Sequence, residues 1–135
     1  MTAGYSETPL AKKLSLRDGQ RCWFEDMPDN IQDEIDEYAL ELTFVGDPAE
    51  GIDAAHIFVT EAEVLGARLV QLRQQIAKDG QVWVSWPKKG SGHETALDQE
   101  QVQSIGIASG FIDTKKCAVD EVWSGLKFVI PKADR

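Results

Sequence analysis

Cysteine, long apolar runs and positive charge are scarce in this chain of 135 residues, and each scarcity argues against some classes of protein. Cysteine is scarce, because Cys22 and Cys117 are the whole supply and no C-x-x-C pair is present. This spacing argues against a disulfide framework or a zinc site and predicts two reduced thiols. Apolar runs are short, since none approaches the roughly 18 residues of a membrane span, and residues 1–8 lack the layout of a signal peptide. We therefore expect a soluble, cytoplasmic protein that does not act on a membrane.

Positive charge is the third scarcity. The formal net charge is −9, and residues 1–60 hold 13 acidic and 4 basic side chains. Between residues 22 and 67 there are 13 Asp or Glu residues and no Lys or Arg. This argues against nucleic-acid binding, because neutralising phosphates requires a basic face. Two interpretations of the acidic region 25–63 remain open: it keeps the domain in solution, or it binds a basic surface of a partner protein.

What the chain does contain is an alternation of strand and helix patterns. Runs of β-forming residues that stop at Pro, Gly or acidic turns predict strands at residues 21–24, 40–45, 54–59, 81–86, 111–119 and 122–130. Apolar periodicity and capping residues predict four helical segments. These are a turn at 10–14, a helix from Asp29 or Asn30 to Tyr38, a helix from the capping box Thr60/Glu63 to Gly80, and a helix from Asp98 and Gln101 to Gly110.

This order predicts an α/β fold with a three-layer, Rossmann-like sheet that is mostly parallel and ends in an antiparallel hairpin. The strand at 81–86 should lie in the centre. With 42% hydrophobic residues, the chain is expected to form one domain over residues 1–135, of which 1–20 are an N-terminal arm.

Three stretches carry a resemblance to a known family. Segments 8–14, 83–89 and 117–129 resemble a bacterial family of short proteins, the domain of unknown function 3052. The resemblance covers nearly the whole chain and is specific at Trp123-Ser124-Gly125. It implies no activity.

A more distant likeness is to the second half of class I S-adenosylmethionine methyltransferases. The turn Lys78-Asp79-Gly80, the pair Gly110-Phe111 and the final hairpin are similar to that pattern. The chain departs from it at residues 25–28, Glu-Asp-Met-Pro, where the family has a G-x-G turn. About eight residues separate the second and third strands, so a helix–strand–helix unit is missing. Deleting that unit from the methyltransferase pattern predicts the strand order 2-1-3-4-6-5, with the last strand antiparallel.

The candidate ligand-binding residues gather around the polar loop after residues 81–86. Gly90 and Gly92 free backbone amides there, which is typical of an anion-binding rim. The candidates are Trp86, Lys88, Lys89, Ser91, His93, Lys116 and Trp123. The alternative is a solvated loop whose lysines balance an acidic chain, with the Trp side chains packed between sheet and helices.

The sequence supplies no catalytic constellation. His56 lies in an apolar strand and is expected to be a hydrogen-bonded core residue, and His93 has no second metal ligand nearby. Cys117 lacks a neighbouring His, and Ser124 is not in a G-x-S-x-G elbow. We therefore expect no catalytic residue, metal or cofactor, and predict a non-catalytic binding or interaction module. The alternatives are a reduced S-adenosylmethionine methyltransferase and a binder of a small anion at the 88–95 loop.

Overall fold

The computed structural model describes residues 8–135, which contain one six-stranded sheet of order β2-β1-β3-β4-β6-β5. The strands are β1 (Arg21–Glu25), β2 (Thr43–Phe44), β3 (Ile52–Phe58), β4 (Ile76–Pro87), β5 (Ile112–Ala118) and β6 (Trp123–Val129). Strands β2, β1, β3 and β4 are parallel to one another, and β6 is antiparallel to both β4 and β5. The predicted fold class, strand order and C-terminal hairpin are confirmed.

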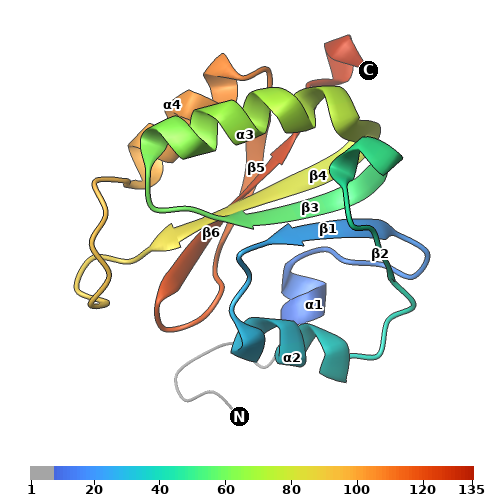
Figure 1. Ribbon diagram of the computed structural model, residues 1–135, viewed down its shortest axis with the longest axis horizontal. Helices are drawn as coiled ribbons and strands as arrows, with labels where there is room; N and C mark the ends of the chain where they lie inside the picture. The colour runs from blue at the N-terminus through green and yellow to red at the C-terminus, as the bar shows by residue number, and fades with distance from the viewer. Residues whose placement is uncertain (1–7) are drawn as a thin grey trace.

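Helices cover both faces of the sheet (Figure 1). They are α1 (Leu10–Lys13), α2 (Asp29–Glu37), α3 (Ala62–Gln75) and α4 (Gln99–Ala108), with 3₁₀ turns η1 (Pro48–Glu50) and η2 (Lys132–Asp134). Helices α3 and α4 bury their apolar stripe on one face, and α1 and α2 bury theirs on the other. The layered arrangement follows because each amphipathic helix must bury one side against the sheet.

The central strands β3 and β4 are buried on both faces, which explains their nearly continuous apolar sequences. Ala55 and Ile57 of β3 face the α3/α4 core, whereas Ala54 and Phe58 face the α1/α2 core. Polar side chains in these strands find partners, as polar groups in a core must. The indole of Trp83, for example, donates to the carbonyl oxygen of Leu14 at 2.8 Å.

The predicted N-terminal arm is part of the core where it is described. Leu10, Ala11 and Leu14 are buried against the sheet. Gln81 also donates to the carbonyl oxygen of Leu14, at 2.8 Å, so two buried donors hold the segment in place. Residues 1–7 of the predicted arm lie outside the described residues.

Several predicted boundaries are wrong, for local reasons. The second strand was expected at 40–45, but only Thr43–Phe44 pairs with β1, at an edge where Phe44 stays 51% exposed. The third helix was expected to run to Gly80, but it ends at Gln75. Ile76 fits the apolar stripe of that helix, yet it is already paired with Ile52 of β3.

Two of the predicted helix caps are also wrong. Helix α3 has Glu61 rather than Thr60 at its N-cap, without a side-chain cap hydrogen bond, because the chain stays extended for one residue longer. Helix α2 has Pro28 at its N-cap, so Asp29 is already helical. The cap at Asp98 is confirmed, because its side chain accepts from the backbone N–H of Gln101 at 2.8 Å.

Within residues 8–135, no helix has both the length and the apolar character that crossing a membrane requires.

Candidate functional site

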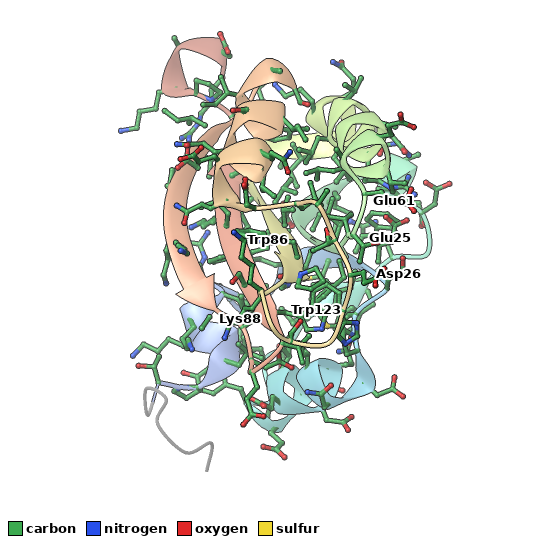
Figure 2. All side chains as sticks on the ribbon, turned by 90° about the vertical axis from the view of Figure 1, so that its left-hand side faces the viewer. Glu25, Asp26, Glu61, Trp86, Lys88 and Trp123 are labelled. Carbon is green, nitrogen blue, oxygen red and sulfur yellow. The ribbon has the colours of Figure 1, made fainter. Side chains whose placement is uncertain are left out.

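Strands β1, β3 and β4 are parallel and end at the same edge of the sheet. We call this the carboxyl edge and define it as residues 25–28, 59–61 and 87–89 together with the loops that adjoin them. The strand order reverses between β1 and β3, because β2 lies on one side of β1 and β3 on the other. In open α/β sheets, ligands bind outside the carboxyl ends of the strands at such a switch. Figure 2 looks onto this edge.

Carboxylates gather where β1 and β3 end. Glu25, Asp26 and Glu61 lie together on one side of the edge in Figure 2. Glu25 is engaged by the protein itself: Arg68 of α3 donates through Nε to Oε1 at 2.9 Å and through Nη2 to Oε2. The same guanidinium lies 5.2 Å from the ring centroid of Trp23. Asp26 and Glu61 are exposed, so this part of the carboxyl edge presents negative charge.

The chain leaves β1 in a strained conformation. Asp26 has a φ of 56°, in the left-handed region, which Asp tolerates better than most residues with a side chain. This turn lets Pro28 open helix α2 directly. At this segment, where the methyltransferase pattern has a G-x-G turn, the chain carries Asp26, Met27 and Pro28.

A cavity of about 460 Å³ lies between α2, the loop after β4 and the β5–β6 turn. It is lined by Pro28, Asn30, Glu34, His93 and residues 120–123, and we call it the Trp123 cavity. Asn30 spans two of its walls, because its Nδ2 donates to Oδ2 of Asp120 at 3.2 Å.

Asp120 organises the turn at one wall of the cavity. Its Oδ1 accepts from the backbone N–H groups of Val122 and Trp123, both at 2.8 Å. Its carbonyl oxygen accepts from Nζ of Lys88 at 2.6 Å. The lysine and the carboxylate are thus committed to fixing the turn, and the cavity wall is preformed.

The structure brings some of the predicted ligand-binding residues together and separates others. Lys88 lies beside the turn, and His93 and Trp123 both line the cavity, with ring centroids 5.9 Å apart. Trp86 is 4% exposed in the α3/α4 core, on the opposite face of the sheet from Trp123. Lys116 reaches toward α4.

The remaining candidates have separate surroundings. Nζ of Lys116 donates to Oε1 of Gln99 at 2.6 Å, away from the cavity. Lys89 is exposed, and Oγ of Ser91 is buried without a hydrogen-bond partner among the described residues. Ligand binding by these residues stays a prediction.

Reactive groups elsewhere are buried in the core. His56 is 1% exposed, with Nε2 2.7 Å from Oγ of Ser85, and burial lowers its pKa to about 3. It is the hydrogen-bonded core histidine that was predicted. Burial, with a smaller contribution from Asp53, raises the pKa of Cys22 to about 12, and burial raises the pKa of Cys117. Both thiols are therefore protonated at neutral pH. In the described part of the chain, His, Cys, Asp and Glu form no cluster of three that could hold a metal ion.

Three residues that contribute to the site were not predicted. Arg68 is the first basic residue after the base-free stretch, which was the signal that it would pair with one of those acids. Asn30 and Glu34 line the cavity because α2 packs beside a turn 90 residues away, and no local pattern encodes that proximity.

Comparisons with known proteins identify a family and a fold. The family described as protein of unknown function (DUF3052) matches residues 11–132. No curated protein matches the chain.

Among solved structures, the chain is similar to magnesium protoporphyrin IX methyltransferase from Synechocystis PCC 6803 with bound SAM. The TM-score is 0.57 and the identity 13%, over 90% of this chain and 76% of that one. It is also similar to a ribosomal protein L11 methylase from Lactobacillus delbrueckii subsp. bulgaricus (TM-score 0.54, 14% identity, 90% and 74% coverage). Aeropyrum pernix fibrillarin with natively bound S-adenosyl-L-methionine matches at a TM-score of 0.53, 10% identity and 93% and 70% coverage. At these identities the likeness shows the fold alone, which is that of class I S-adenosylmethionine methyltransferases.

Proposed function

We propose that this chain, which belongs to the DUF3052 family of proteins of unknown function, is a non-catalytic interaction module. It binds a positively charged segment of another protein at its carboxyl edge. The observation that carries this proposal is the concentration of exposed carboxylates at the place where ligands bind in this class of sheet.

Those carboxylates come from separate elements. Asp26 and Glu61 lie where β1 and β3 end, and Glu34 and Glu121 line the Trp123 cavity. Helix α2 extends the negative surface, because it buries Ile31 and Ile35 and exposes its acids. The exposed acids of α2 beyond Asp29 are Asp33, Glu34, Asp36 and Glu37. A field of this sign repels phosphates and speeds the encounter with a basic protein surface.

S-adenosylmethionine is the rival ligand, because two structural neighbours contain it bound. The residues at the carboxyl edge do not fit it. Side chains and Pro28 stand where a glycine turn would let the ligand approach the backbone. The Glu25 carboxylate is held by Arg68, and Asp47, which follows β2, caps η1 by accepting from the backbone N–H of Ala49 at 2.9 Å.

A thermal-shift titration separates the two candidates. A ligand present at 100 times its dissociation constant stabilises a protein by about 2.7 kcal/mol. We expect no shift of the melting temperature with S-adenosylmethionine. A saturable shift would favour the rival function.

The interaction itself is tested by capture from a lysate of the source organism at ~20 mM and ~0.5 M salt, since exposed charge contacts weaken as the Debye length falls below about 5 Å. The test variant is Asp26→Asn with Glu61→Gln, where β1 and β3 end. The control, Glu41→Gln with Asp79→Asn, changes the net charge equally near the opposite edge of the sheet. A partner bound by the wild type and the control at low salt, and lost with the test variant or at high salt, supports the proposal. Equal behaviour of both variants contradicts it.

A further inference from the structure

The Trp123 cavity has features that suit one kind of side chain. We propose that it receives an arginine of the bound segment, with the guanidinium between the Trp123 indole and the carboxylates of Glu34 and Glu121. This inference rests on the proposed function and names the group that the site recognises.

The walls of the cavity carry negative charge. Among the described residues, no hydrogen bond or ion pair engages the carboxylate of Glu34 or Glu121, and both side chains are exposed. The Asp120 carboxylate adds negative charge, although its oxygens already accept three hydrogen bonds. The ammonium of Lys88 lies on the Asp120 carbonyl oxygen and offsets only part of this charge. Such walls attract a cationic group.

One wall of the cavity is aromatic. The indole of Trp123 lines the cavity and packs edge-to-face on Phe58, with ring centroids 5.0 Å apart. His93 also lies near the indole, with 5.9 Å between ring centroids. An aromatic face beside carboxylates recognises a cation by a cation–π contact together with charge-assisted hydrogen bonds.

Arginine suits this combination better than lysine does. Its planar guanidinium stacks on an aromatic face while its forked N–H groups meet a carboxylate, whereas the lysine ammonium is a compact, strongly hydrated charge. The protein shows the same chemistry internally, because Arg68 lies over Trp23 and donates two hydrogen bonds to Glu25.

The cavity is also preorganised and of suitable size. The Asn30–Asp120 and Lys88–Asp120 hydrogen bonds join α2, the loop after β4 and the β5–β6 turn, so the walls need little rearrangement on binding. Its volume of about 460 Å³ lies within the range of small-ligand sites.

The probe for this proposal is the peptide acetyl-Gly-Arg-Gly-amide, titrated into the full chain and followed by ¹H–¹⁵N NMR at low salt. The matched control peptide carries citrulline, which has the shape of arginine without its charge. We expect saturable shifts of the Trp123 indole N–H and of the amides of His93 and Glu121, and affinity about threefold or more lower for citrulline.

Single substitutions test the individual contacts. Trp123→Leu should weaken arginine binding by about fivefold, and Trp123→Phe should restore part of the loss because it keeps an aromatic face. Glu121→Gln should weaken it by about threefold, whereas Asp33→Asn, an equal charge change outside the cavity, should have less than about half that effect.

Shifts away from the cavity, equal binding of the citrulline peptide, or equal losses from Glu121→Gln and Asp33→Asn would overturn the arginine site. Capture of a basic partner in a salt-dependent manner would still support the proposed function in that case. Failure of both experiments would remove both claims.

Discussion

Acidification should destabilise this protein through one buried side chain, His56. Its ring lies in the core, stacked on Phe58 at 4.5 Å between centroids and hydrogen-bonded to Ser85 at 2.7 Å. Burial lowers its pKa to about 3, against about 6.5 for an unperturbed histidine. Between these values the unfolded chain binds a proton that the folded chain excludes. The stabilising contribution is therefore fully present above about pH 6.5 and is lost as the pH falls toward 3.

The size of the effect follows from this difference. Each pH unit well below the unfolded pKa costs at most about 1.4 kcal/mol of unfolding free energy. Integrated from about pH 7.5 to about pH 5, the contribution of His56 to the loss of stability is about 2 kcal/mol. This is a substantial share of the 5–15 kcal/mol that typically stabilises a small domain.

Urea unfolding followed by Trp fluorescence at a series of pH values measures this contribution. His56→Gln removes the titratable group and keeps a polar side chain near Ser85, and His93→Gln is the matched control on the surface. The fall in unfolding free energy from about pH 7.5 to about pH 5 should be about 2 kcal/mol smaller in His56→Gln than in the wild type. The control should behave as the wild type does.

Two outcomes would refute this reasoning. One is an identical pH dependence in His56→Gln and the wild type. The other is an NMR titration of the folded wild type in which the His56 ring gains a proton above about pH 5. The second measurement does not depend on the variant being stable.

Two further predictions concern packing and the ion pair at the carboxyl edge. Gly106→Ala in α4 should cost about 1–3 kcal/mol, because a Cβ there would overlap the ring of Phe128 and outweigh the helix-propensity gain of Ala. Gly66→Ala in α3, where the nearest atom is 3.8 Å away, should instead stabilise the protein by up to about 1 kcal/mol in the same urea assay. If both substitutions changed the unfolding free energy in the same direction, the packing described here would be contradicted. A double-mutant cycle with Glu25→Gln and Arg68→Met should give a coupling free energy of about 1 kcal/mol, and a value near zero would mean that the pair does not hold the end of β1 to α3.

Much of the fold could be predicted from the sequence, because the interactions that form each helix or strand are local. Strands β3 and β4 are apolar on both faces, and the cap at Asp98 needs only residues 98–101. The strand order came from the methyltransferase likeness, since pairing between distant strands has no local signal. The end of α3 was missed because Ile76 satisfies a helical stripe and a strand pairing equally well.

The site was less predictable, because it depends on register. Trp86 pairs with Ser124 and Pro87 with Trp123, so the two tryptophans are one position apart in register and point to opposite faces. The sequence alone cannot reveal that offset. The surroundings of the lysines near the polar loop could not be predicted from the sequence either. Their charge suggested an anion site, whereas Lys88 donates to a backbone carbonyl and the adjoining cavity is lined by acids.

The central claim is that the carboxyl edge binds a positively charged segment of another protein. Zero-length carbodiimide cross-linking of the captured complex, mapped by mass spectrometry, tests it most directly because this reagent joins a lysine to a carboxylate in contact with it. The account predicts cross-links from partner lysines to Asp26 and Glu61, the exposed carboxylates of this edge that the arginine site does not use. Cross-links that fall instead on Glu41 and Asp79 near the opposite edge, or that spread evenly over both edges, would contradict it.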